Sequence, residues 1–431
     1  FFTSLVPVKT ACQLLTSPDR LGRDLSALRT VVDGYLDNVV TGVHVLPFYP
    51  SSADRGFAPL TYERVDPVFG IWEDIELLGA EKDLIVDFMV NHISRQSSYF
   101  QDFAANKDAS PYSGLFIRYD RFWPAGRPTE KDLNAIYTRK PRPPYLEVAF
   151  ADGSSEKVWC TFDYEQVDVD LSRPETRRFI GEQLRSLCER GARVIRLDAV
   201  AYTTKRPGTK CFFLEPEIWE YLAFICEEVS GYDVELLPEV HEHYTLQLAL
   251  AEKGYWVYDF ALPMLILQAL YDGDARNLKR WLAMCPRKQI TTLDTHDGIG
   301  VVDVVDLMSP EDIERTKENL FRRGANVKPI YSSQAYNNLD VYQLNCTYYS
   351  ALGDDDDAYL LARAIQFFAP GITKIYYFGV RAGEWLTTIT VQKKRPCRWG
   401  FDRGDRGGPE SGERVSVCGN AQRRPNPRPA T

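Results

Sequence analysis

The sequence predicts an α/β protein, a (β/α)₈ or TIM barrel, on three observations. Short apolar runs of strand-like composition recur eight times along the chain. Helical patterns lie between most of them, as in residues 176–191, where Phe179, Ile180 and Leu184 form an apolar stripe and Gly191 marks the end. With 431 residues, 44% of them hydrophobic, the chain can bury one large core. Strands that alternate with helices run parallel, and eight such units close into a barrel.

In chain order, the predicted strands are residues 12–16, 42–48, 83–90, 193–200, 234–240, 255–262, 289–295 and 374–379. Two intervals between strands are too long for a single helix. Residues 93–171 are rich in proline, aromatic and charged residues, which predicts a small β-rich insertion after the third strand. Residues 302–358 predict a second insertion, after strand seven, with a polar and aromatic loop over the site.

These intervals divide the chain into six parts. We expect the first part of the barrel at 1–92, the inserted small domain at 93–171, the continued barrel at 172–301, the second insertion at 302–358 and the last barrel strand region at 359–383. Residues 384–431 are rich in arginine, glycine and proline and have no apolar period, so we expect a divergent tail without packed structure.

The composition excludes several classes of protein. A net charge of −9 argues against nucleic acid or an anionic membrane as the main partner, because both would repel the average surface. No apolar run approaches the length that crosses a bilayer. Nine cysteines without paired C-x-x-C spacing favour reduced thiols, and hence a cytoplasmic location.

Three carboxylates lie at or just after the ends of three separate predicted strands. Asp198 lies near the end of "VIRLDAV", Glu239 near the end of "ELLPEV", and Asp297 in "TTLDTHDGIG". Any one of them alone is more typical of a turn residue or a helix cap. Together, at the carboxyl ends of barrel strands, they predict a site that cleaves a glycosidic bond, since this reaction needs one ionised and one protonated carboxyl group.

The flanking residues indicate which carboxyl group is ionised and which is protonated. Arg196 lies two residues before Asp198, on the same strand face, and we expect it to hold Asp198 ionised as a nucleophile requires. Glu239 follows Leu236, Leu237 and Pro238, so we expect an apolar neighbourhood that keeps it protonated as a general acid.

No metal or organic cofactor is predicted. The chain has five histidines, and His241 and His243 have no third ligand at zinc-binding spacing, so they more plausibly line the sugar cleft. No phosphate-cradling glycine loop or nucleotide fingerprint is present. The acidic run 354–357 is typical of a solvated helix start.

The segments around these residues resemble one family. They are "PFYPSSADRGFAPLTY", "VDFMVNHISRQS", "VIRLDAVAY", "LLPEVHEHYT", "YDFALPM", "TTLDTHDGIGVVD" and "YNNLDVYQLNCTYYSALGDDD". In order and with few gaps, they resemble sucrose phosphorylases and related glucoside phosphorylases of glycoside hydrolase family 13, in the alpha-amylase superfamily. The likeness spans about Cys12 to Gly383 and implies the barrel, both insertions and a separate C-terminal β domain.

The resemblance implies roles for individual residues. Asp198 would be the nucleophile, Glu239 the acid/base and Asp297 the transition-state stabiliser, with Arg196 orienting Asp198. The substrate-binding residues implied are Asp54, His92 and His296 for glucose hydroxyls, Phe57 and Phe162 as an aromatic platform, Tyr202 beside it, and Tyr342 and Gln343 on the acceptor side. Arg139, Lys140 and Arg142 are candidates for steering phosphate, although surface solvation explains any single one of them equally well.

The implied reaction is retaining phosphorolysis of sucrose, with inorganic phosphate as co-substrate and no cofactor. A phosphorylase of glucosylglycerate, glucosylglycerol or sucrose 6′-phosphate is an alternative, and so is an inactive sugar-binding remnant. After "YYFGV" the likeness stops, so we expect the family's C-terminal β domain, and a glucose-contacting arginine before it, to be absent. The partners implied are small molecules, and a homodimer is also compatible with the resemblance.

Overall fold

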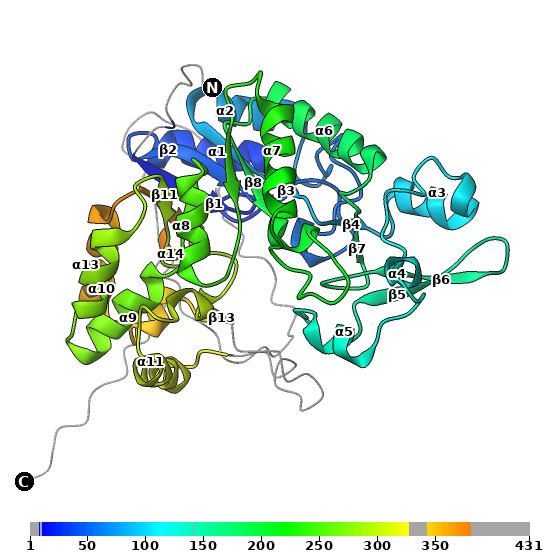
Figure 1. The fold of residues 1–431 in the computed structure, drawn as a ribbon. Coiled ribbons are helices and arrows are strands. Elements are labelled where there is room, and N and C mark those ends of the chain that lie inside the picture. Colours follow the sequence, from blue (N-terminus) through cyan, green and yellow to red (C-terminus); the bar gives the residue numbers. More distant parts are fainter. Residues whose placement is uncertain (1–7, 9–10, 141, 327–342, 381–431) are drawn as a thin grey trace, which may run out of the picture. The chain divides into compact units, whose positions relative to one another are not determined.

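The computed structural model describes residues 8, 11–140, 142–326 and 343–380. Eight parallel strands form one sheet, ordered β10-β11-β14-β1-β2-β3-β8-β9 (Figure 1). Their bounds are β1 Cys12–Thr16, β2 Val40–Val45, β3 Asp83–Met89, β8 Val194–Asp198, β9 Glu235–Pro238, β10 Val257–Asp259, β11 Gln289–Thr291 and β14 Ile372–Tyr376. All eight predicted strands are present, and the predicted barrel is confirmed.

The sheet closes between its two edge strands. The backbone N–H of Trp256, just before β10, donates to the carbonyl oxygen of Leu236 in β9 at 3.3 Å. Several predicted strand ends differ from the structure. For example, β10 ends at Asp259 and helix α9 (Leu262–Asp272) begins three residues later, where Pro263 suits the first helical turn, and Tyr377–Val380 form the short helix α14.

Helices follow most strands and cover the barrel. Pro174–Glu189 (α6) agrees with the predicted apolar stripe, and it buries Ile180, Leu184 and Leu187. The others are α1 Leu25–Val31, α2 Trp72–Glu81, α7 Glu217–Val229, α8 Tyr244–Glu252, α9 Leu262–Asp272, α10 Arg276–Met284 and α13 Asp356–Phe368.

The first insertion extends to one side of the barrel in Figure 1. It contains the expected β structure: the β5–β6 hairpin (Tyr145–Ala149, Ser155–Trp159), and β7 Gln166–Asp168, which pairs with β4 His92–Ser94 where the insertion begins. Three helices accompany them: α3 Ser98–Asn106, α4 Tyr119–Phe122 and α5 Glu130–Ala135. Helix α3 begins where the Ser97 hydroxyl accepts a hydrogen bond from the amide of Phe100.

The second insertion contains α11 Pro310–Arg322, β13 Gln343–Leu344 and α12 Tyr348–Ala351. β13 pairs with β12 Ile299–Gly300, which lies just before the predicted start of the insertion at residue 302. Several predicted features lie outside the described residues. They are Tyr342, most of the predicted loop over the site, the point at which the family likeness stops, and the tail 384–431.

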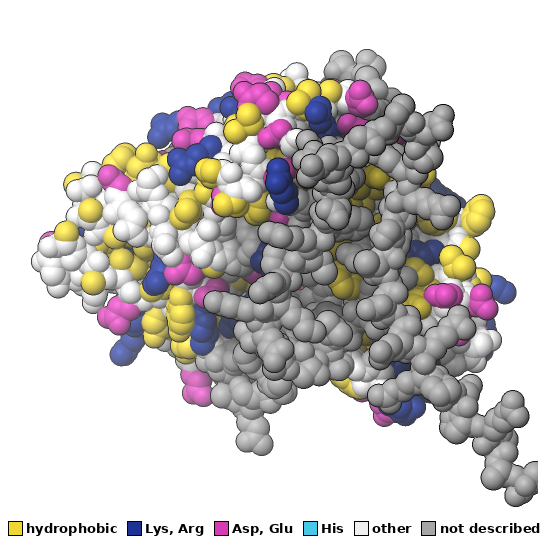
Figure 2. Space-filling model, turned by 180° about the vertical axis from the view of Figure 1, so that it is seen from behind, with side chains coloured by type: hydrophobic (Ala, Val, Ile, Leu, Met, Phe, Trp, Pro, Cys, Tyr) yellow, Lys and Arg dark blue, Asp and Glu magenta, His cyan; other side chains and the backbone are white. Residues whose placement is uncertain are grey.

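The surface carries both acidic and basic side chains, as expected from a sequence with 51 basic and 60 acidic residues. On the face shown in Figure 2, acidic and basic side chains are interspersed among apolar ones over the described part. Within the described ranges, no helix has both the length and the apolar character to span a membrane. The seven cysteines that the structure describes are all free thiols.

Candidate active site

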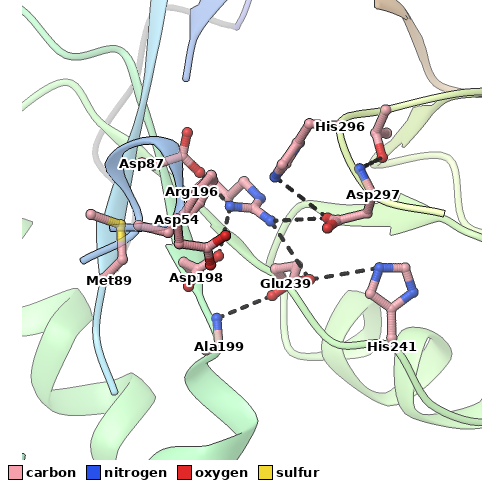
Figure 3. Close-up of polar contacts among 12 residues, drawn as sticks. Asp54, Asp87, Met89, Arg196, Asp198, Ala199, Glu239, His241, His296 and Asp297 are labelled. Atoms are coloured by element: carbon pink, nitrogen blue, oxygen red, sulfur yellow. Dashed lines mark hydrogen bonds and ion pairs between the residues drawn. The ribbon is translucent and has the colours of Figure 1, made fainter. Parts of the chain in front are cut away.

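The three predicted carboxylates converge at the carboxyl ends of the strands. Asp198 is the last residue of β8, Glu239 follows β9, and Asp297 lies in the loop after β11 (Figure 3). The amide of Glu239 donates to Leu197 of β8 at 3.1 Å, which fixes the two strand ends side by side. All three side chains line one cleft of about 560 Å³, within the size range of small-molecule sites.

Arg196 lies beneath the cleft and contacts four carboxyl groups. Its Nη1 donates to Asp198 Oδ1 at 3.0 Å and also to Asp87 Oδ1. Its Nη2 lies 3.6 Å from Glu239 Oε1 and 3.9 Å from Asp297 Oδ2. Because the guanidinium is 3% exposed, it is a rigid positive centre around which the acidic groups are arranged.

One arginine does not neutralise this many buried acids. Burial raises the pKa of Asp198 well above its usual range; the charge of Arg196 lowers it, and the charges of Glu239, Asp87 and Asp297 raise it again. The predicted contact between Arg196 and Asp198 exists, and the charge of Arg196 favours the ionised carboxylate, whereas burial and the neighbouring acids oppose it. The acidic cluster has a deficit of positive charge, and the oxocarbenium-like transition state of glycoside cleavage supplies such a charge.

The surroundings of Glu239 are polar, which corrects the apolar neighbourhood expected from its sequence neighbours. Leu236 and Leu237 turn into the hydrophobic core. The Glu239 carboxylate instead accepts a hydrogen bond from the backbone N–H of Ala199 at 3.0 Å, and it lies 3.6 Å from His241 Nε2. Ala199 has φ of 54°, a left-handed conformation that directs this amide across to β9.

Asp297 lies beside Arg196 and His296 at the more open side of the cleft. Burial raises the pKa of Asp297, but the charges of His296, Arg196 and His241 outweigh burial and hold it below its usual value. The ring of His296 stacks on Phe57, with 5.1 Å between centroids and 5° between planes. Among the described residues, His296 Nδ1 is a buried nitrogen without a hydrogen-bond partner, so it is available to a hydroxyl group.

The loop after β2 brings Asp54 to the same cleft. Asp54, Arg55 and Gly56 have φ of 53°, 50° and 111°, a run of left-handed residues of the kind that clusters at functional sites. Gln166, which the sequence analysis did not single out, donates its amide to Asp54 Oδ2 at 3.3 Å and to the carbonyl of Phe57 at 3.0 Å. Its position on β7 of the insertion gave no local signal of this role.

Aromatic rings continue the wall of the cleft from Asp54 toward the insertion. Phe162 meets His92 and Tyr202 edge to face, with centroids 5.3 and 5.0 Å apart. Burial lowers the pKa of His92, so its imidazole is neutral near neutral pH. Neutral imidazole and aromatic faces are the groups that suit a sugar ring with its hydroxyls.

The opposite side of the cleft contains His241 and Gln343. Their side-chain nitrogens, both Nε2, lie 2.9 Å apart, and the His241 ring stacks on Phe260 at 3.7 Å. Burial lowers the pKa of His241, but its hydrogen bond to Asp303 and the negative charge of Glu239 outweigh burial and raise it. The part of the cleft next to Glu239, the proposed acid/base, is therefore lined by the polar side chains of His241 and Gln343.

Of the three cations considered for phosphate, two lie at the cleft. Arg139 and Lys140 line it, whereas Arg142 donates to the carbonyl of Phe162 at 3.0 Å and stacks on Tyr164. His243, which was expected to line the sugar cleft with His241, does not: its ring contacts Asp306 at 3.1 Å and Thr245 at 2.8 Å. Arg196 lies beneath the cleft and Tyr342 lies outside the described residues, and the other predicted catalytic and substrate-binding residues line this cleft. They are Asp54, Phe57, His92, Phe162, Asp198, Tyr202, Glu239, His296, Asp297 and Gln343.

Glu239, His241 and Asp297 could in principle hold a cation, since one ligand atom of each lies within 4.8 Å of the others. The Arg196 guanidinium, at 3.6 and 3.9 Å from two of them, already supplies positive charge to this group.

Comparison with known proteins identifies the family. Residues 28–254 match the alpha-amylase catalytic domain. The chain is 50% identical over 379 residues to a sucrose phosphorylase of Streptococcus mutans, covering 88% of this chain and 79% of that protein. It is 44% identical to a glucosylglycerol phosphorylase of Marinobacter adhaerens, covering 87% and 78%.

A solved structure gives the same result. The crystal structure of a sucrose 6F-phosphate phosphorylase from Thermoanaerobacter thermosaccharolyticum superposes with a TM-score of 0.85 at 42% identity, covering 88% of this chain and 79% of that one. The chain therefore belongs to the alpha-amylase family of enzymes, glycoside hydrolase family 13, and within it to the sucrose phosphorylase-like glucoside phosphorylases.

Proposed function

We propose that this enzyme catalyses phosphorolysis of sucrose to α-D-glucose 1-phosphate and D-fructose, with retention of configuration. The observation that carries the proposal is the convergence of Asp198, Glu239 and Asp297 around Arg196, in a chain 50% identical to a sucrose phosphorylase. Free thiols support a cytoplasmic location for such a reaction.

In the first step, Asp198 attacks the anomeric carbon of the glucosyl unit and a covalent glucosyl-enzyme forms. The bond from that carbon to the bridging oxygen breaks, and Glu239 gives its proton to the oxygen that leaves with fructose. The Ala199 amide, at 3.0 Å from Glu239 Oε2, holds the acid in place. Asp297 stabilises the positive charge that develops on the sugar ring.

In the second step, phosphate attacks the same carbon from the face that fructose left. The bond to Asp198 breaks, Glu239 takes up the phosphate proton, and α-glucose 1-phosphate leaves. Phosphorolysis rather than hydrolysis requires that phosphate outcompete water, and the positive charges of Arg139 and Lys140 along the cleft favour an anionic acceptor.

We assign the glucosyl side of the cleft to Asp54, Phe57, His92, Phe162, Tyr202, His296 and Asp297. His241 and Gln343 face the leaving group and the acceptor. The unpartnered Nδ1 of His296 and the neutral imidazole of His92 support hydroxyl recognition.

A second candidate function is phosphorolysis by the same mechanism of an α-glucoside other than sucrose. Relatives that are 44% and 43% identical are a glucosylglycerol phosphorylase and a sucrose 6(F)-phosphate phosphorylase, so the glucosyl side of the cleft can serve several donors.

The test is release of glucose 1-phosphate from a panel of donors with phosphate: sucrose, sucrose 6′-phosphate, glucosylglycerol and glucosylglycerate. We expect sucrose to give the highest kcat/KM and Asp198→Ala to give no product. A higher value for another donor would reassign the substrate. Glucose binding in calorimetry without turnover of any donor would identify an inactive remnant.

A further inference from the structure

A line of buried charged groups crosses the barrel interior beneath the active site. It contains Lys374 of β14, His44 of β2, Asp87 of β3 and Arg196 of β8, and none of these residues is more than 3% exposed. Bulky branched apolar residues dominate the interior of most barrels of this type, so this polar line requires an explanation.

Each member of the line contacts the next. Lys374 Nζ lies 3.0 Å from His44 Nδ1, and His44 Nε2 lies 2.9 Å from Asp87 Oδ2. The other oxygen of Asp87 accepts from Arg196 Nη1, and the same nitrogen donates to Asp198 Oδ1 at 3.0 Å. An unbroken path therefore joins Lys374 to the proposed nucleophile.

The chemistry of these groups fixes the protons along the path. A lysine ammonium only donates, so His44 Nδ1 must accept, and the imidazole proton lies on Nε2, where it donates to Asp87. Burial lowers the pKa of His44 to about 3, which keeps the ring neutral. Burial also lowers the pKa of Lys374 to about 7, so the ammonium is the favoured form below that pH.

With these protonation states, charges alternate along the path. Lys374, Arg196 and Asp87 are charged, and the proposed role of Asp198 requires its ionised form, so positive and negative groups alternate, with neutral His44 between Lys374 and Asp87. Without the lysine charge, the two carboxylates would have only Arg196 between them. The buried line would then carry a net negative charge, which is costly in a medium of low dielectric constant.

We propose that Lys374 is a positioning residue for the nucleophile: through His44 it compensates the charge of Asp87, and thereby leaves Arg196 available to keep Asp198 ionised and aimed. This inference rests on the proposed function in one respect, namely that Asp198 is the nucleophile. The groups that face Lys374 are His44, Tyr258, Asp87 and Arg196. Those that face Asp198 are Arg196, Glu239, Asp87 and Asp297.

The test substitutes Lys374→Gln, which retains an N–H donor for His44 but has no charge. The substrate is α-glucosyl fluoride, because fluoride leaves with little help from an acid, so its release reports the ionisation of Asp198 and not the preference for a particular α-glucoside. We expect the acid limb of kcat/KM to move upward by about one pH unit, which lowers kcat/KM about tenfold along that limb.

Lys82→Gln is the matched control. Lys82 is also a buried lysine, with an ion pair of 2.7 Å to Asp37, but it lies at the amino-terminal side of β3. Its substitution should lower the melting temperature and leave the pH profile unchanged. If Lys374→Gln gives a profile that superposes on that of the wild type, the positioning role is refuted and the lysine has a structural role alone.

A second readout does not depend on turnover. In ¹⁵N-histidine spectra, with His44 assigned by His44→Gln, we expect the neutral tautomer with the proton on Nε2 between pH 5 and 8. The opposite tautomer, or a doubly protonated ring at pH 7, would overturn the proposed line. Wild-type protein that shows this tautomer but releases no fluoride would refute the proposed function and support the charge line.

Discussion

The backbone N–H of Ala199 donates to Glu239 Oε2 at 3.0 Å, and Ala199 directly follows Asp198. The end of β8, which carries the proposed nucleophile, thus holds Glu239, the proposed acid/base that follows β9. This amide points to Glu239 because Ala199 is left-handed, with φ of 54°. A β-branched residue is strained in that conformation, whereas glycine adopts it freely.

The first prediction concerns this amide. Ala199→Val should lower kcat about tenfold or more, because the strained backbone rotates the N–H away from Glu239. Ala199→Gly, the matched control, should retain most of the activity. Steady-state kinetics with a far-UV spectrum of each variant would decide. Equal kcat for the two variants would show that the amide does not hold the acid.

The second prediction concerns the guanidinium of Arg196. Arg196→Lys keeps the charge but loses the fork that contacts Asp198, Asp87 and Glu239 at once, so kcat/KM should fall about 10²-fold or more. Arg193→Lys, five residues from the end of β8, removes a contact with the exposed Asp233 and should change kcat/KM less than about twofold. Comparable losses in the two variants would contradict the account.

The third prediction concerns the loop that carries Asp297. Arg363 of α13 is buried and donates to Asp294 Oδ1 at 2.8 Å, and this aspartate is three residues before Asp297. Arg363→Met leaves the Asp294 carboxylate buried without its cation, which should lower the free energy of unfolding by about 3–5 kcal/mol and lower kcat as well.

Arg315→Met is its control. Arg315 pairs with Asp272 at 2.6 Å in an exposed setting, so its loss should change the free energy of unfolding much less than Arg363→Met does and leave kcat unchanged. Urea unfolding and kinetics on both variants provide the comparison. An active, fully stable Arg363→Met protein would show that this ion pair does not support the loop.

The fourth prediction concerns the pH dependence of stability. Folding lowers the pKa of His44 from 6.5 to about 3, because the ring is fully buried. Between these values the unfolded chain binds a proton that the folded chain does not, so His44 makes stability fall as pH falls from 6.5 toward 3. Its contribution is at most about 1.4 kcal/mol per pH unit.

His44→Gln lacks this titration, so the difference in unfolding free energy between wild type and variant should narrow from pH 6.5 to pH 4.5. Urea denaturation at several pH values measures it. A constant difference across this range would mean that His44 does not titrate as a buried neutral ring.

Much of the barrel was predictable because each strand carries its own local signal. "VIRLDAV" reads as a strand by composition and alternation, and β8 spans Val194–Asp198. Prediction was weaker at strand ends. Tyr376, Tyr377 and Phe378 suit a strand as well as a helical turn, and tertiary packing decides that Tyr377–Val380 is helical. The helices of the first insertion were missed because proline and turn residues around them dominated the pattern.

The sequence predicted which residues make up the site better than it predicted the charges and polar groups around them. Spacing of two residues placed Arg196 beside Asp198, and the structure has this contact. The polar surroundings of Glu239 come from Ala199 and His241, and the line from Lys374 joins residues 330 positions apart. Contacts of that range arise from barrel closure, which no local pattern specifies.

The central claim is that Asp198 carries the glucosyl group, and mass spectrometry tests it most directly. Glu239→Gln with α-glucosyl fluoride, without phosphate, forms the intermediate but lacks the base that activates water. We expect a stoichiometric burst of fluoride and, after acid quench and digestion, one glucosyl group on the peptide and side chain of Asp198. Fluoride released with Asp198 unmodified, or with the glucosyl group on another residue, would contradict the account.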